Sequence, residues 1–116
     1  MGLNFRAGDA RWSYSGFNRF RTKLASQIGI NLNAMEGFKE GGGGMPWSKV
    51  EDNIVLLLQH SDCDGELTVK ECKRVWPRLE ELIKYWEEND YDKINALRLI
   101  EDMKGTIKKK EPLEFR

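Results

Sequence analysis

Apolar residues recur every three or four positions in several stretches of the chain, which is the spacing that places them on one face of an α-helix. The first such stretch covers residues 15–28. Its apolar positions are Phe17, Phe20, Leu24 and Ile28. Ser13 or Ser15 can cap its start, and Gly29 can end it in a left-handed conformation. We therefore predict a first helix over residues 15–28.

A second helix is predicted over residues 48–59. Ser48 and Glu51 have the spacing of a capping box, in which a hydroxyl and a carboxylate satisfy the free amides at a helix start. The apolar run at 54–58 is wider than one stripe, which indicates a central helix.

A third helix is predicted over residues 68–88, starting from a second capping box at Thr68 and Glu71. Pro77 lies inside this stretch and lacks a backbone donor, so we expect a kink or a break there. A fourth helix follows the turn at 89–92. Its apolar residues are Ile94, Leu97, Ile100, Met103 and Ile107, and it should end at Gly105 or at 108–110.

The two ends of the chain, at 3–5 and 113–115, alternate apolar and polar residues as short strands do. They could pair as a small two-stranded ribbon above the helices. Residues 37–46 contain a run of glycines and predict a flexible surface loop. The fold class is thus mainly α, a compact bundle of about four helices in a single domain spanning residues 1–116.

The composition narrows the class of protein. The 116 residues carry 19 basic and 19 acidic side chains, so the net charge is zero, which argues against a duplex-DNA binder. No apolar run approaches the length of a membrane span, and no secretory signal is evident. Two cysteines cannot build a disulfide scaffold, and the cytoplasm is the expected compartment. The first 30 residues are basic, which suggests a local surface for an anionic group.

The segment from His60 to Glu71 is twelve residues long and resembles the calcium-binding loop of the EF-hand family. The resemblance places a glycine, Gly65, at the sharp turn and a buried apolar anchor, Leu67, at the eighth position. It implies a helix–loop–helix at the centre of the bundle and a weak calcium site. The implied metal ligands are His60, Asp62, Asp64, Glu66, Thr68 and Glu71.

Two features depart from the EF-hand pattern. The first ligand position is His60, and an imidazole is a poor ligand for calcium. EF-hand loops also usually pair, and no second loop is visible. Hydrogen bonds could fill the loop in place of a metal ion. A zinc site of His60, Cys63 and Cys72 is an alternative, although Cys72 lies on the apolar face of its helix and fits a small core residue.

A second candidate site is the basic and aromatic segment at the start of the first helix. Its candidate ligand-binding residues are Arg11, Trp12, Tyr14, Arg19 and Arg21. Arginine binds phosphate through two parallel hydrogen bonds, aromatic rings stack on bases, and a helix start favours anions. The alternative is that the aromatic residues belong to the core and the arginines lie on a solvated face.

The sequence Trp-Ser-Tyr-Ser-Gly-Phe at 12–17, taken with His-Ser-Asp-Cys-Asp-Gly at 60–65, is similar to a family of short uncharacterised phage and bacterial proteins. That resemblance implies a phage or mobile-element origin but no activity. We predict a non-enzymatic binding protein that sequesters or inhibits a host component, either a signalling nucleotide or a host protein. The alternative is an EF-hand-type calcium regulator or buffer. A metal-dependent hydrolase is disfavoured because no nucleophile or base accompanies the acidic residues.

Overall fold

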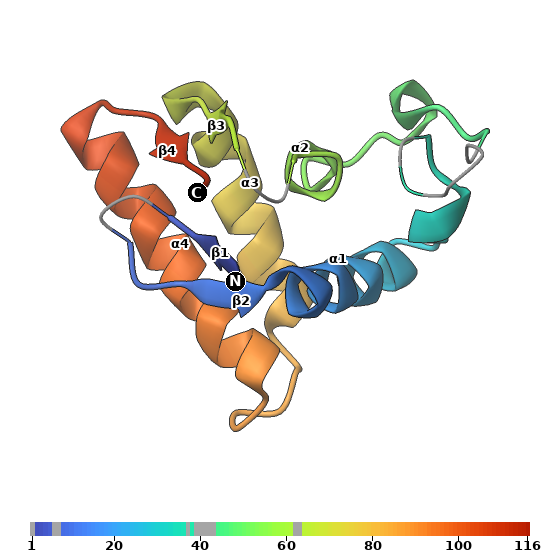
Figure 1. Cartoon of the computed structure of the whole chain (residues 1–116), viewed down its shortest axis with the longest axis horizontal. Helices are drawn as coiled ribbons and strands as arrows, with labels where there is room; N and C mark the ends of the chain where they lie inside the picture. The colour runs from blue at the N-terminus through green and yellow to red at the C-terminus, as the bar shows by residue number, and fades with distance from the viewer. Residues whose placement is uncertain (1, 6–7, 37, 39–43, 62–63) are drawn as a thin grey trace.

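The computed structural model of the chain describes residues 2–5, 8–36, 38, 44–61 and 64–116. Its helices are α1 (Tyr14–Gln27), α2 (Val55–Leu58), α3 (Val69–Ile83) and α4 (Tyr91–Lys109), with 3-10 turns at Leu32–Ala34 and Trp47–Lys49. Its strands are β1 (Gly2–Asn4), β2 (Arg11–Ser13), β3 (Glu66–Leu67) and β4 (Leu113–Glu114). In the described part of the chain the fold is mainly helical, as the hydrophobic spacing predicts (Figure 1).

The ends of α1 and α4 lie where the sequence places them. The Ser13 side chain caps α1 by accepting a hydrogen bond from the amide of Gly16. Gly29, just past the helix, has a φ of 81°, a conformation that suits a residue without a Cβ. Asp90 caps α4 in the same manner, and this helix continues past Gly105 to end at Lys109.

The start of α3 is confirmed and its end is not. Thr68 and Glu71 form the predicted capping box. Pro77 lies inside α3, and the helix continues past it without the break that was one of the two expectations. The helix ends at Ile83 instead of 88, because the chain turns there and the Lys93 ammonium donates to the carbonyls of Lys84 and Trp86.

The predicted helix over residues 48–59 is wrong for most of its length. Residues 47–49 make a 3-10 turn in which no side chain caps the start, and α-helix appears only at residues 55–58. Asp52 accounts for the late start. Its Oδ1 atom accepts the amide of Ile54, and its carboxylate binds the Arg78 guanidinium of α3 at 2.9 Å. A side chain anchored to another helix thus takes the place of the capping box.

Both small sheets are antiparallel. Leu3 pairs with Trp12 in the β1–β2 sheet, and Leu67 pairs with Leu113 in the β3–β4 sheet. The termini also meet, as predicted, through a bridge between Phe5 and Phe115. The predicted ribbon is therefore present as a short junction, and each terminal segment has a second partner that the alternating pattern did not reveal.

Helices α3 and α4 pack along each other, and the two small sheets cover the interior between the helices (Figure 1). The buried side chains of all four helices and all four strands form one hydrophobic cluster. Its largest fully buried members include Phe17, Phe20, Leu57, Leu79 and Ile83. None of the helices in the described residues is long and apolar enough to cross a membrane.

Candidate functional site

Three features of the loop from His60 to Glu71 can be compared with what the EF-hand resemblance implies. Gly65 has a φ of 83°, so the sharp turn occurs at the sixth position. Leu67 is buried and belongs to a short strand. Thr68 then caps α3. Asp62 and Cys63 lie outside the described residues.

His60 lies against the interior of this loop. Its Nε2 atom is 2.9 Å from the carbonyl oxygen of Glu66, and its Nδ1 atom is 2.9 Å from that of Ser61. The ring also stacks on Phe115, with the ring centroids 3.8 Å apart. The resemblance assigns the Glu66 carbonyl to the cation, and here the imidazole contacts that oxygen. Hydrogen bonding within the loop is therefore the arrangement that the described residues show.

The remaining implied ligands do not converge in the described residues. One Glu71 oxygen accepts the amide of Thr68, and the Asp64 side chain is exposed. No group of three or more His, Cys, Asp or Glu residues able to hold a metal ion occurs in the described part of the chain. The calcium and zinc sets that include Asp62 or Cys63 fall partly outside the described residues.

Cys72 behaves as a core residue. Its side chain is fully buried, and burial raises the pKa of the thiol to about 11. The sulfur donates weakly to the Leu67 carbonyl at 3.8 Å and lies 4.0 Å from the Thr106 hydroxyl. The protonated thiol is therefore neither a nucleophile nor a ready metal ligand at neutral pH.

The basic and aromatic segment divides into an inward and an outward set. Trp12 belongs to the inward set and is 2% exposed. Its ring stacks on Phe20 at 4.6 Å, and its indole nitrogen donates to Asp92 at 3.0 Å. With both ring faces in the core, Trp12 cannot stack on a nucleotide base. The prediction that Trp12 binds a ligand is therefore wrong.

Arg21 is also directed inward, although the sequence places it on a face open to water or ligand. Its side chain is 4% exposed, and the guanidinium lies 4.6 Å from the centroid of the Phe17 ring. Its Nη1 atom donates to the carbonyl oxygens of Leu58 and His60. Arg21 thus binds the carbonyl of Leu58, the last residue of α2, and that of His60, two residues beyond it.

Arg11 and Arg19 form the outward set, and Tyr14 is partly buried between the two sets. Strand alternation places Arg11 and Ser13 on the face of β2 opposite Trp12. The Ser13 and Ser15 hydroxyl oxygens are 3.5 Å apart, and Arg19 follows Ser15 by one helical turn. We call these exposed residues the basic strip: Arg11, Ser13, Ser15 and Arg19. Neither arginine forms an ion pair within the described residues.

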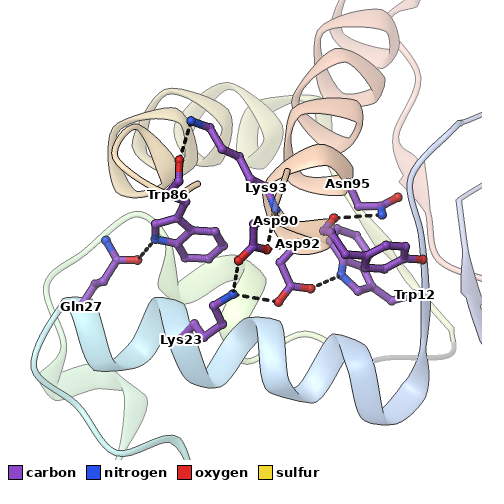
Figure 2. Close-up of polar contacts among 9 residues, drawn as sticks. Trp12, Lys23, Gln27, Trp86, Asp90, Asp92, Lys93 and Asn95 are labelled. Atoms are coloured by element: carbon purple, nitrogen blue, oxygen red, sulfur yellow. Dashed lines mark hydrogen bonds and ion pairs between the residues drawn. The ribbon is translucent and has the colours of Figure 1, made fainter. Parts of the chain in front are cut away.

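A network of polar side chains joins α1 to the start of α4 (Figure 2). We call it the polar seam; its members are Trp12, Lys23, Gln27, Trp86, Asp90 and Asp92. The Lys23 ammonium is 3.2 Å from Asp90 and 3.0 Å from Asp92, and it lies over the Trp86 ring. The Trp86 indole donates to Gln27 at 2.7 Å. Sequence reasoning missed this network, because its partners are more than fifty residues apart.

The charges of the polar seam stabilise one another. Burial alone would lower the pKa of Lys23, but hydrogen bonds to Asp92 and Asp90 outweigh it and raise that pKa. Burial alone would raise the pKa of Asp90, but hydrogen bonds from Lys23 and from the amides of Lys93 and Asp92 outweigh it and lower that pKa. Lys23 is therefore occupied within the chain, unlike the arginines of the basic strip.

The surface has a hollow of about 420 Å³ between the carboxyl half of α4 and the carboxyl-terminal segment. Its acidic lining residues are Glu66, Glu101, Asp102, Glu111 and Glu114. Asp102 accepts the amides of Asp9 and Ala10, and burial raises the pKa of its carboxyl. Asp102 therefore anchors the segment before β2.

Comparisons with protein-family models, with curated proteins and with solved structures return no match.

Proposed function

We propose that this protein is a non-enzymatic binding protein, which sequesters or inhibits a partner protein by contacting carboxylates of that partner with its basic strip. The contrast among its basic side chains is the observation that carries the proposal. Arg21 and Lys23 are bonded within the fold, whereas Arg11 and Arg19 are exposed and have no acidic partner among the described residues.

The chemistry at the strip suits an anionic surface. Each guanidinium can hold a carboxylate by two parallel hydrogen bonds, and the two serine hydroxyls can donate as well. Arginine is also enriched where protein interfaces derive most of their affinity. The strip continues into Tyr91, which is 61% exposed and donates its hydroxyl proton to the Arg11 carbonyl.

A protein partner is favoured over a nucleotide. A nucleotide pocket needs an aromatic face for the base, and the indole of Trp12 is buried against Phe20. The phage-protein resemblance motivates the choice of a host protein as the partner. The non-enzymatic reading is supported by His60, the single histidine of the chain, whose two ring nitrogens both contact carbonyl oxygens.

A capture experiment with matched variants tests the proposal. The wild-type chain, an Arg11→Ala/Arg19→Ala variant and a Lys70→Ala/Lys73→Ala control are immobilised and exposed to host extract, and bound proteins are quantified by mass spectrometry. The control removes two exposed cations from α3. We expect a protein that is retained by the wild type and the control and lost from the strip variant.

The direct measurement follows with the purified partner. Loss of one charge-assisted contact costs about 1.5–3 kcal/mol of binding free energy, so calorimetry should show at least about tenfold weaker binding by the strip variant. Equal capture by all three baits contradicts the proposal. Titration of the wild type with nucleoside triphosphates and cyclic dinucleotides is the companion assay, and tight binding there would assign the strip to a nucleotide.

A calcium-binding role is the second candidate function. It is supported by the left-handed Gly65, the buried Leu67 and the capping box at Thr68, three features that the EF-hand resemblance implies. The contact between His60 and the Glu66 carbonyl opposes it. Replacement of His60 by aspartate removes this contact and tests the calcium-binding role.

A further inference from the structure

Arg98 is an exposed side chain on α4, at the junction between that helix and β2. It follows Asn95 by three residues and precedes Asp102 by four, so it lies next to both on the helix surface. Asn95 accepts the amide of Arg11 at 3.1 Å, and Asp102 accepts the amide of Ala10 at 3.1 Å. Arg98 is therefore placed beside the start of β2.

Tyr91 belongs to the same junction. Its hydroxyl donates to the Arg11 carbonyl at 3.0 Å, and the residue is exposed. Ile94 is 38% exposed and lies between Tyr91 and Arg98 at helical spacings of three and four residues. These three residues therefore form one stripe along α4, about 10 Å long. The backbone of Arg11 is held against one end of it.

The carboxylates on α4 beside this stripe are bonded elsewhere. Asp92 is 3.0 Å from the Lys23 ammonium, and Asp102 accepts two backbone amides. Glu101 lies 3.7 Å from the Lys104 ammonium. By contrast, three exposed arginines form no ion pair within the part of the chain that the structure describes: Arg11, Arg19 and Arg98. The junction therefore presents guanidinium groups to which no carboxylate of the described chain is bound.

We propose that the partner segment bound by the basic strip is acidic and carries apolar side chains, and that Arg98, Tyr91 and Ile94 belong to its binding site. This inference rests on the proposed function, because it names the partner chemistry for the same surface. Carboxylates of the segment bind guanidinium groups on both sides of the junction. Apolar side chains among those carboxylates cover the Tyr91 ring and Ile94. A partner that offered only anionic groups would leave this part of the stripe uncovered.

Titration of the isotope-labelled chain with three synthetic peptides, followed by NMR, tests this chemistry. The first peptide carries glutamates and leucines in a serine background, the second has serine in place of leucine, and the third has glutamine in place of glutamate. We expect the first to bind and to shift the amide signals of Arg11, Tyr91, Ile94 and Arg98. The second should bind at least about threefold more weakly, because it buries no apolar side chain. The third should show no saturable binding, because it has no carboxylate for the guanidinium groups.

Single substitutions locate the site. Arg98→Ala should weaken binding of the first peptide about tenfold, which is the effect of losing one charge-assisted contact. Lys73→Ala is its control, since Lys73 is an exposed cation on α3. Tyr91→Ser should remove the preference for the peptide that contains leucine. Tyr85→Ser is its control, since Tyr85 is 88% exposed and lies outside the stripe. Both controls should bind like the wild type, and circular dichroism confirms that each variant is folded.

The strip variant Arg11→Ala/Arg19→Ala separates this inference from the proposed function. Weaker peptide binding in both the strip variant and Arg98→Ala supports one continuous site. If only the strip variant binds more weakly, the basic strip acts without α4 and the inference is overturned. If only Arg98→Ala binds more weakly, the junction is a site for acidic segments and the role of the strip is contradicted.

Two results with the wild type overturn the inference directly. One is equal affinity for the peptides with leucine and with serine, which would remove the apolar part of the partner chemistry. The other is the absence of binding to any of the peptides at millimolar concentration. In that case the capture experiment still decides the proposed function, because it depends on the strip variant alone.

Discussion

The segment from Arg11 to Arg21 and the loop from His60 to Glu71 hold their side chains by different means. The segment depends on distant partners: Trp12 bonds to Asp92, and Arg21 bonds to carbonyls at the end of α2. The loop combines near contacts, those of His60 with the Glu66 carbonyl and of Thr68 with Glu71, with long-range ones, the stacking of His60 on Phe115 and the pairing of Leu67 with Leu113. Near contacts need only residues of the same segment. Long-range contacts form only when the distant elements that supply their partners are folded in place.

The two regions also meet, because Arg21 donates to the His60 carbonyl. The segment therefore supports the loop from outside, while its other arginines face solvent. Substitutions can separate these inward and outward roles and can show whether the loop is self-sufficient.

The largest effect is expected at Trp12. Trp12→Ala removes a buried indole, its stacking on Phe20 and a hydrogen bond to Asp92, and should reduce the free energy of unfolding by about 3–5 kcal/mol. Arg11→Ala, next to it and exposed, should stay within about 0.5 kcal/mol. Urea denaturation followed by tryptophan fluorescence measures both. Similar values for the two variants would remove the distinction between inward and outward side chains.

Arg21→Met should have the next largest effect. The methionine keeps an apolar stem but leaves the buried carbonyls of Leu58 and His60 without their donor, which should cost about 1.5–3 kcal/mol of unfolding free energy. Arg19→Met is the control and should change stability by less than about 0.5 kcal/mol. Hydrogen exchange should show faster opening of α2 and the loop in the first variant. Unchanged exchange there would mean that the loop needs no support from α1.

Lys23→Met tests the polar seam and should cost about 1–2 kcal/mol, because it removes an ion pair with two carboxylates and a cation–π contact. The pKa of Lys23 is raised, so its contribution is present below pH 10.5 and is lost as the pH rises above that value. The pKa of Asp90 is lowered, so its contribution is present above pH 3.8 and is lost as the pH falls through the lowered pKa.

The difference in unfolding free energy between the wild type and Lys23→Met should therefore be largest near neutral pH and shrink toward both extremes. Chemical denaturation at a series of pH values measures it. A difference that does not vary with pH would show that Lys23 acts through packing of its stem.

The two capping boxes should respond differently to the loss of their hydroxyl groups. Thr68→Ala should cost about 1 kcal/mol, because Thr68 accepts the amide of Glu71 at the start of α3. Ser48→Ala should cost less than about 0.5 kcal/mol, because no side chain caps the 3-10 turn that contains it. Thermal denaturation of both variants checks this, and a larger cost at Ser48 would contradict the described geometry.

The smallest effect concerns calcium. His60→Asp restores the carboxylate of the EF-hand pattern and releases the Glu66 carbonyl, so calcium should stabilise this variant, by about 0.4 kcal/mol when its concentration equals the dissociation constant. Adding Asp64→Ala or Glu71→Gln to this variant should abolish the response. Thermal shifts at millimolar calcium measure it. No shift in either the wild type or His60→Asp would leave the loop as a purely structural turn.

Elements with local signals could be predicted from the sequence. The starts of α1, α3 and α4 rest on Ser13, Thr68 and Asp90, whose side chains bond to amides two or three residues away. The predicted helix at 48–59 failed although it had the same kind of signal. There Asp52 is bonded to Arg78, a partner 26 residues along the chain, and no spacing rule reveals that contact.

The candidate sites show the same limit. Their residues were recognisable by type, but the direction of each side chain was not. Tryptophan and arginine can either bind a ligand or join parts of a fold, and Trp12 and Arg21 do the latter because Asp92 and the end of α2 lie beside them. The polar seam escaped prediction for the same reason.

The sequence by itself determined the starts of the helices that have local caps and the place where Gly65 turns the loop. Those features follow from interactions between near neighbours and from the conformational freedom of glycine. Tertiary structure alone decided that Arg21 and Lys23 are bonded inside the fold while Arg11 and Arg19 remain exposed. Side chains of the same charge have different roles because burial and distant partners decide whether each guanidinium or ammonium group bonds within the fold or stays in water. No local sequence pattern encodes either factor.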